Sequence, residues 1–214
     1  MNLQKKGLRM DISVEPTKGL IFVQQRWRYQ YKLESPAVSV WTGSEKARYH
    51  SLFDRLIWQI WSQRYIVRVR GTSDFAKKYA ELKFVVSMDV KWVLVYPHWT
   101  VQLTKLRKSA TFFQSYVDWT NRLIALDTLD SVLTKKAGGS ATLKQYGVTH
   151  EFGHTMGNIP GLYAGAHGDE YENSSQYFTD KRSIMNIGNE IRQRHIDYLL
   201  KELNMLHPNT EFYL

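Results

Sequence analysis

The sequence predicts an α+β domain. Three observations support this class: strand-like segments up to about residue 106, an amphipathic pattern after residue 44, and a helix-like segment around residue 150. The chain has 214 residues and 25.1 kDa, enough to bury one core. We therefore expect a single domain over 1–214, with a sheet-rich part over about 1–139 and a more helical part over about 140–214.

The first clear element is a strand over 20–33, where apolar and polar residues partly alternate and aromatic residues are frequent. A helix is expected after Ser44, a residue type that suits the N-cap. Its buried stripe follows the three- and four-residue spacing of one helix face. The stripe consists of Tyr49, Leu52, Phe53, Leu56, Ile57 and Ile60.

Further strands are expected over 65–70, 82–96 and 99–106, the second being long enough for two strands or one bulged strand. The signals over 109–136 conflict. A helix would place Phe112, Phe113, Tyr116, Trp119 and Leu123 on one side, whereas 122–127 also suits a strand. Both alternatives stay open here. The run K-A-G-G-S over 136–140 predicts a break in regular structure.

Two helices are expected in the last part of the chain. Thr142 and Gln145 have the spacing of a capping box, which predicts a helix from there to about Gly157. The closing helix is expected over about 189–206. Its inward residues would be Ile196, Leu199, Leu200 and Leu203.

The helix that ends near Gly157 carries the pattern H-E-x-x-H at 150–154. Positions i and i+4 lie on one helical face, so His150 and His154 can bind one metal ion. Glu151 places a carboxylate beside that ion without using a ligand position, where a general base is needed. Gly157 suits a helix end because glycine accepts positive φ.

These residues resemble the metzincins, a clan of zinc peptidases whose long motif is H-E-x-x-H-x-x-G-x-x-H/D followed by a methionine-containing turn, the Met-turn. The resemblance covers His150, Glu151, His154 and Gly157, with Met185 in the turn-like run S-I-M-N. It rests on the last third of the chain. The family's third-ligand position falls on Pro160, which cannot bind metal, so the ligand must come from elsewhere.

The third ligand is expected in the loop that follows. Asp169 is the preferred candidate, because G-D-E-Y over 168–171 is similar to bacterial secreted or toxin-associated metalloprotease domains in which an aspartate binds the zinc. His167 is the main alternative, since histidine is the commoner third ligand. Glu170 is a further alternative.

The resemblance implies a metzincin-like catalytic domain with a twisted mixed sheet, a long active-site helix, the Met-turn and a C-terminal helix. It also implies one catalytic Zn²⁺ and a peptide or protein substrate, cleaved by a zinc-bound water with Glu151 as general base. The further donor to the substrate carbonyl would be His195, or else Tyr171. Met185 would pack beneath the histidines, and the strand over 99–106 would be the sheet edge that pairs with substrate. A bacterial effector or toxin is the implied setting.

Charge and composition leave two other classes of function open. The net charge of +9 suits an anionic partner, but most basic residues are scattered or alternate along strands, as on a solvated face. A metzincin-like binding module without activity is one alternative. A basic nucleic-acid or anionic-surface binder with an accidental motif is the other, although no stacked-aromatic or helix-turn-helix pattern supports specific nucleic-acid binding.

The absence of cysteine excludes disulfides and zinc fingers. The first ten residues carry charges but no apolar region of a signal peptide after them, and no apolar run of 18 residues predicts a membrane span. If the protein is exported, we expect a route without such a signal peptide. The oligomeric state is not indicated by the sequence.

Overall fold

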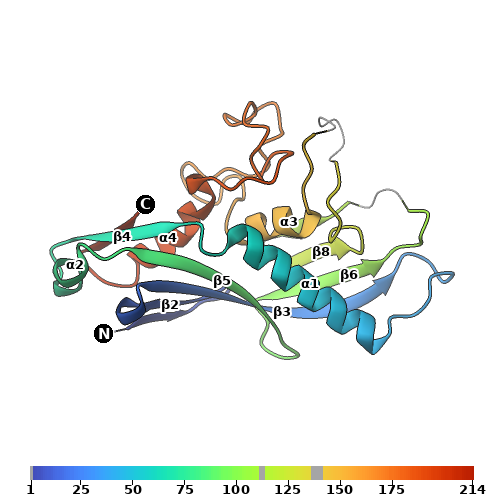
Figure 1. The fold of residues 1–214 in the computed structure, drawn as a ribbon, viewed down its shortest axis with the longest axis horizontal. Helices are drawn as coiled ribbons and strands as arrows, with labels where there is room; N and C mark the ends of the chain where they lie inside the picture. The colour runs from blue at the N-terminus through green and yellow to red at the C-terminus, as the bar shows by residue number, and fades with distance from the viewer. Residues whose placement is uncertain (1, 111–113, 136–141) are drawn as a thin grey trace.

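The computed structural model describes residues 2–110, 114–135 and 142–214 (Figure 1). Within them the chain forms an α+β fold with a mixed nine-stranded sheet and four α-helices. The strands are β1 (Leu3–Lys6), β2 (Asp11–Glu15), β3 (Leu20–Leu33), β4 (Ile66–Gly71), β5 (Phe84–Trp92), β6 (Trp99–Lys105), β7 (Tyr116–Asp118), β8 (Leu123–Asp127) and β9 (Thr210–Tyr213). The helices are α1 (Gly43–Trp61), α2 (Asp74–Tyr79), α3 (Gly147–Thr155) and α4 (Asp197–Asn204), with short 3-10 turns η1 (Pro16–Lys18) and η2 (Gln193–Ile196).

The sheet runs in the order β7-β8-β6-β3-β5-β4-β9, with β1 and β2 attached beside the first half of β3. Strand β3 is parallel to β5 and β6, and β6 is parallel to β8. Strands β2, β4 and β7 are antiparallel to their neighbours. On one side of β3 the partner changes from β2 to β6 along its length, so the sheet divides there.

Helices α1 and α3 cover one face of the sheet, where the core lies (Figure 1). The alternation along β3 sends Trp27 and Tyr29 into this core and Arg26 and Arg28 to the opposite face. The inward stripe predicted for α1 is confirmed: Phe53, Leu56 and Ile57 are buried, and Tyr49, Leu52 and Ile60 pack against the core. Trp61, which was not predicted, is buried as well.

The predicted N-cap of α1 is wrong by two residues. Thr42, not Ser44, is the N-cap: its hydroxyl accepts from Glu45 N–H at 3.2 Å, and the Glu45 carboxylate accepts from Thr42 N–H at 2.8 Å. This reciprocal pair satisfies two donors at the start of the helix, which a cap at Ser44 would leave unpaired.

The strands predicted over 20–33, 65–70 and 99–106 are confirmed as β3, β4 and β6. The strand predicted over 82–96 ends at Trp92, and residues 93–98 form a loop. The role of an edge strand, predicted for 99–106, is wrong. Strand β6 pairs with β3 on one side and β8 on the other, so its hydrogen bonds are used. In the described part of the chain β7 pairs with β8 alone and ends the sheet on this side.

Of the two alternatives over 109–136, the strand is confirmed by β8, and Tyr116 lies in the strand β7 instead of a helix. Phe112 and Phe113 lie outside the described residues, as do the break over 136–140 and the expected division near residue 139.

The predicted starts of the last two helices are both wrong. Helix α3 begins at Gly147, because Gln145 forms a β-bridge with Thr134 instead of capping a helix. Helix α4 begins at Asp197 after η2, because Glu190 is bridged to Ser183 and cannot join a helix. Ile196, Leu199 and Leu203 are buried as expected. Among the helices in the described ranges, none has the length and apolar character to cross a membrane.

Candidate metal centre

Helix α3 presents His150 and His154 on one face, and every residue of it from Val148 to Thr155 is buried. The helix is fixed against α1 by Trp61, whose indole N–H donates to the Thr149 carbonyl at 3.0 Å. The Trp61 ring also meets Phe152 edge-on at 5.5 Å between centroids. These contacts hold the two histidines in place before any ligand binds.

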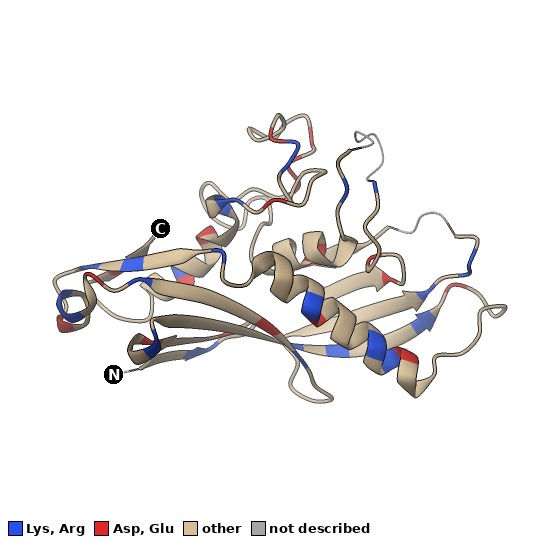
Figure 2. Ribbon diagram, in the orientation of Figure 1, with Lys and Arg blue, Asp and Glu red and all other residues tan. Residues whose placement is uncertain are grey.

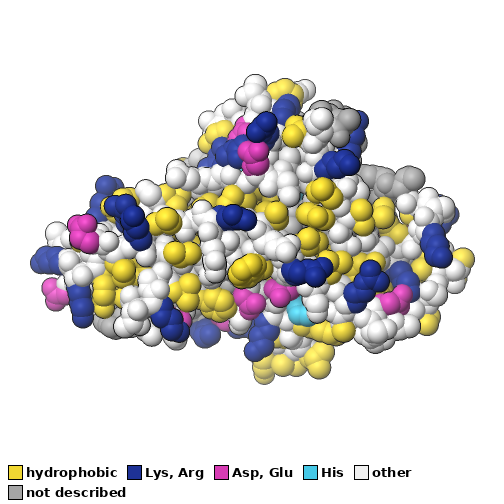
Figure 3. Space-filling model, in the orientation of Figure 1, with side chains coloured by type: hydrophobic (Ala, Val, Ile, Leu, Met, Phe, Trp, Pro, Cys, Tyr) yellow, Lys and Arg dark blue, Asp and Glu magenta, His cyan; other side chains and the backbone are white. Residues whose placement is uncertain are grey.

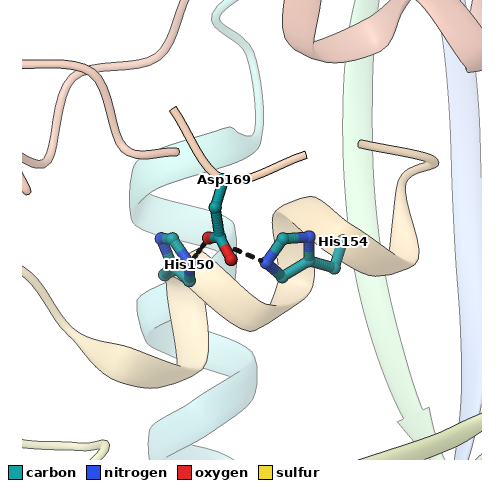
Figure 4. A group of neighbouring side chains, drawn as sticks. All are labelled: His150, His154 and Asp169. Atoms are coloured by element: carbon teal, nitrogen blue, oxygen red, sulfur yellow. Dashed lines mark hydrogen bonds and ion pairs between the residues drawn. The ribbon is translucent and has the colours of Figure 1, made fainter. Parts of the chain in front are cut away.

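Backbone carbonyls set the direction of both imidazoles. His150 Nδ1 lies 2.7 Å from the Ile184 carbonyl oxygen, and His154 Nδ1 lies 2.7 Å from the Asn158 carbonyl oxygen. A carbonyl can only accept, so each Nδ1 carries a proton, which leaves Nε2 as the ring nitrogen that can bind an ion. Both Nε2 atoms face the same point (Figure 4). A hydrogen bond from Nδ1 to a backbone carbonyl is typical of histidines that bind metal through Nε2.

Asp169 supplies the third atom of the group. Its Oδ1 lies 3.0 Å from His150 Nε2 and 3.4 Å from His154 Nε2 (Figure 4). Ligand atoms around a tetrahedral zinc ion with bonds of about 2.1 Å are about 3.4 Å apart, which is close to both values. Burial raises the pKa of the Asp169 carboxyl, but hydrogen bonds from the two histidines outweigh burial and hold it well below its usual range.

The other two candidates for the third ligand lie outside this group. The His167 ring packs edge-on against Tyr177 at 5.1 Å, with Nδ1 3.5 Å from Glu170 Oε1. Glu170 is fully buried, and its two carboxylate oxygens accept from Arg194 at 2.7 and 2.9 Å. Its charge is therefore already compensated by a guanidinium.

Glu151 lies in the wall of a cavity of about 1190 Å³ together with His150, His154 and Asp169. The residue is 7% exposed, and its Oε2 is buried without a hydrogen-bond partner in the described part of the chain. Burying a carboxylate oxygen without a hydrogen-bond partner costs free energy. Such an oxygen indicates a partner from outside the chain, such as a ligand or a water molecule.

The predicted Met-turn lies directly beneath α3. Met185 is fully buried, and a Cβ added at Gly153 would lie 2.3 Å from its Sδ. Met185 thus lies against α3 at Gly153, while its role in orienting the histidines stays a prediction. Gln145, which the sequence indicated only as a cap, fixes this turn: its side-chain amide donates to three carbonyl groups. They belong to Ile184, Asn186 and Gly188, at 3.4, 3.1 and 2.8 Å.

The role predicted for His195 does not fit the structure. His195 is 1% exposed and is absent from the cavity wall. Its Nδ1 accepts from Arg192 N–H at 3.0 Å, and its Nε2 lies 3.2 Å from Ser183 Oγ. Burial lowers its pKa to about 4 despite the nearby Glu170 carboxylate. Both ring nitrogens are engaged behind the turn, so neither is available to a substrate.

Tyr171, the second candidate for that role, does line the cavity, and its ring stacks near His150 at 6.2 Å between centroids. Burial, together with a hydrogen bond to Asp169, raises the pKa of its phenol well above the usual range. The phenol therefore keeps its proton, which it shares in the hydrogen bond with Asp169.

Two carboxyl groups in the cavity wall were missed by the sequence analysis. Asp127 and Asp130 are 1% and 9% exposed, and Asp130 Oδ2 accepts from Ser115 Oγ at 2.7 Å and Asp127 N–H at 2.8 Å. Burial raises the pKa of Asp127 to about 6, and burial together with the Asp127 charge holds the pKa of Asp130 well above its usual range. The spacing D-T-L-D at the end of β8 was the available signal.

His150, His154 and Asp169 thus form a buried group that could hold a metal ion, with all three ligand atoms within 4.8 Å of one another. It lies in the wall of a large cavity together with Glu151, whose Oε2 has no hydrogen-bond partner among the described residues. Compared with known protein families, curated proteins and solved structures, the chain has no match.

Proposed function

We propose that the protein is a zinc-dependent endopeptidase. The observation that carries this proposal is the combination of two pre-oriented histidines, a carboxylate within 3.4 Å of both, and the unpaired Glu151 carboxylate in the same cavity wall. A group that only binds metal has no need for a buried, unpaired carboxylate next to it.

The donor set suits zinc. Two neutral imidazole nitrogens and one carboxylate oxygen make a three-ligand site of the kind found in catalytic zinc proteins, which leaves a fourth position open. Calcium and magnesium prefer sites made of oxygen atoms alone. When bound, zinc supplies Lewis acidity, which brings the pKa of a coordinated water to near 7 and polarises a carbonyl oxygen.

Two side chains of this protein would carry the remaining steps. Glu151 accepts the proton of the attacking water and passes it to the leaving amine, because no group in the described ranges competes for its Oε2. Tyr171 would turn its O–H from Asp169 to the substrate carbonyl oxygen as negative charge develops there, since its phenol keeps its proton.

The edge of the sheet supports an extended peptide as substrate. Among the described residues no strand pairs with the second side of β7, and Tyr116 and Val117 line the same cavity as His150 and Glu151. An extended chain that pairs with a free strand edge places its carbonyl groups at regular spacing along the cavity. A bacterial effector or toxin acting on proteins of another cell is the setting that agrees with the D-E-Y resemblance.

The Glu151→Gln variant tests the mechanism. Because glutamine keeps the size but cannot accept the proton, zinc content should match wild type while cleavage of a mixed peptide library falls by at least a hundredfold. Glu172→Gln is the matched control, since Glu172 lies in the cavity wall but is exposed. It should cleave like wild type.

Two outcomes would contradict the proposal. Activity of Glu151→Gln within tenfold of wild type would exclude Glu151 as the base. Wild-type protein that retains zinc but cleaves no peptide would instead support a metal-binding module without hydrolytic activity. Wild-type protein that retains no zinc would show that the H-E-x-x-H pattern is accidental.

A further inference from the structure

The loop over 93–98, which joins β5 to β6, presents apolar side chains to solvent. Leu94, Val95 and Tyr96 are 77%, 65% and 85% exposed, and Leu8, from the turn between β1 and β2, is 62% exposed. The loop carries no charged residue (Figure 2), and hydrophobic side chains gather where it projects from the lower edge of the molecule (Figure 3). Large apolar residues gathered at one exposed point mark an interaction site.

This loop is held in its extended position by the strand beneath it. Val93 N–H donates to the Trp27 carbonyl at 2.9 Å, His98 N–H donates to the Arg26 carbonyl at 2.8 Å, and Arg26 Nε donates to the Tyr96 carbonyl at 2.9 Å. Tyr96 has a φ of 51°, a conformation that a bulky residue adopts only where its surroundings impose it. The apolar side chains are therefore presented by a fixed framework.

Beside the loop lies a cavity of about 460 Å³ whose wall contains three guanidinium groups. They belong to Arg26, Arg28 and Arg122, and the same wall includes Leu8 and Tyr96. The cavity forms where the partner of β3 changes from β2 to β6, so the divided sheet creates it. The cationic cavity and the apolar loop thus form one continuous surface, which we call the docking face.

The arginines of the docking face have spare hydrogen-bond donors. Arg28 donates to Thr100 Oγ1 at 3.2 Å, and Arg122 donates to the Leu8 and Pro97 carbonyls at 3.3 and 3.4 Å. Throughout 2–110, 114–135 and 142–214, no carboxylate forms an ion pair with either of them. A guanidinium has five N–H donors, so most remain free for an anion.

The charge around the cavity is positive. Asp11 compensates Arg26 but is shared with Lys6 at 3.4 Å. His98 is buried beside Arg26 and Asp11. Burial together with the Arg26 charge lowers the pKa of its imidazole to about 4, so His98 adds no charge at neutral pH. Three guanidiniums and one carboxylate leave a net charge of +2, and guanidinium groups bind phosphate oxygens in a bidentate manner.

We propose that the docking face binds the surface of an anionic phospholipid bilayer. The apolar loop would enter the interfacial layer while a lipid phosphate occupies the cavity between the arginines. The exposed aliphatic side chains Leu8, Leu94 and Val95 favour this partner over nucleic acid, because they can enter a lipid layer but cannot stack on bases. Arg28 lies on the face of the sheet opposite α1 and α3, and the docking cavity shares no wall residue with the metal cavity. Docking therefore leaves the metal cavity open, and the inference does not depend on peptidase activity.

Sedimentation with vesicles tests the proposal. Wild-type protein should bind phosphatidylcholine vesicles that contain about one-third phosphatidylserine at least tenfold more strongly than vesicles of phosphatidylcholine alone. Arg28→Gln should weaken binding about fivefold, the loss expected for one basic residue near a charged bilayer. The double substitution Leu94→Ser and Val95→Ser should weaken it at least tenfold, because it removes the apolar contact.

Matched controls are available on the other side of the molecule. Arg48→Gln removes the same charge from an exposed position of α1, and Val40→Ser removes an apolar side chain that is 73% exposed. Both should bind like wild type. Equal binding of wild type to the two kinds of vesicle would overturn the proposal, and so would loss of binding in the controls to the same extent as in the docking-face variants.

A second measurement reports the depth of the loop directly. The fluorescence of a Leu94→Trp variant should be quenched by brominated lipid tails, and the absence of quenching in sedimented protein would overturn insertion of the loop. Thermal stabilisation by inorganic phosphate without any vesicle binding would identify the cavity as a site for soluble phosphate and would likewise overturn the proposal.

Discussion

The identity of the third metal ligand gives the sharpest prediction. Asp169→Ala removes the oxygen that lies 3.0 and 3.4 Å from the two Nε2 atoms and leaves only His150 and His154 to hold the ion. Metal retention should then fall about as far as in His154→Ala, because each variant loses one of three protein ligands.

The size of the effect follows from the number of ligands. Structural zinc sites with four ligands bind with about 10–16 kcal/mol, or roughly 2.5–4 kcal/mol for each ligand. Loss of one ligand should therefore weaken the zinc affinity by about 10²–10³-fold. His167→Ala is the matched control, since His167 lies in the same loop and cavity wall but outside the group of three. Its zinc affinity should stay near that of wild type.

Zinc affinity is measured by competition with a chromophoric chelator, and zinc content is measured after dialysis against a weak chelator. Full metal content in Asp169→Ala combined with loss in His167→Ala would refute the assignment and make this a three-histidine site. Loss in both variants would show that the loop as a whole, and not the Asp169 carboxylate, determines retention. Asp169→Asn separates these effects further, because it preserves the side-chain volume and removes the charge.

Two further predictions concern stability. Gly153→Ala should destabilise the fold by ~1–3 kcal/mol in thermal unfolding, because the added Cβ would lie 2.3 Å from Met185 Sδ and 3.1 Å from the Trp61 ring. This loss of stability should be smaller when Gly153→Ala is combined with Met185→Ala. An unchanged stability of Gly153→Ala would show that the contact is not tight. Burial raises the pKa of Asp127 to about 6, so the folded protein holds a proton that the unfolded chain releases from about pH 4 upward. The contribution of Asp127 to stability should therefore fall by ~1–3 kcal/mol as the pH rises from about 4 to 6, and Asp127→Asn should flatten this part of the melting-temperature profile; an unchanged profile would contradict the raised pKa.

Features that depend on local spacing could be predicted from the sequence. The stripe of α1 and the strand β3 follow from periodicity, and the common direction of His150 and His154 follows from their separation of four residues. Asp169 came from a resemblance, since nothing in the spacing of a long loop indicates which of its residues returns to the helix.

Features that depend on distant segments could not be predicted. Gln145 was predicted to cap a helix, but its side-chain amide donates hydrogen bonds to carbonyl groups about forty residues later in the chain. His195 had a suitable distance from the Met-turn, yet the direction of its ring depends on Ser183 and Arg192, which only the folded turn brings together. Strand order likewise decides that β7 and not β6 is the edge, and strand order is set by pairing between distant segments.

The three ligands belong to parts of the chain with different structural support, and this has a kinetic consequence. His150 and His154 lie on a helix buried in the core, whereas Asp169 lies in the stretch over 158–192, which contains turns and isolated bridges but neither helix nor regular strand. Such a stretch can open locally at a lower free-energy cost than global unfolding. Exchange of the ion would then be controlled by the opening rate of this stretch. Hydrogen exchange would show slower opening over 158–192 when metal is added, with little change in β3 and β6.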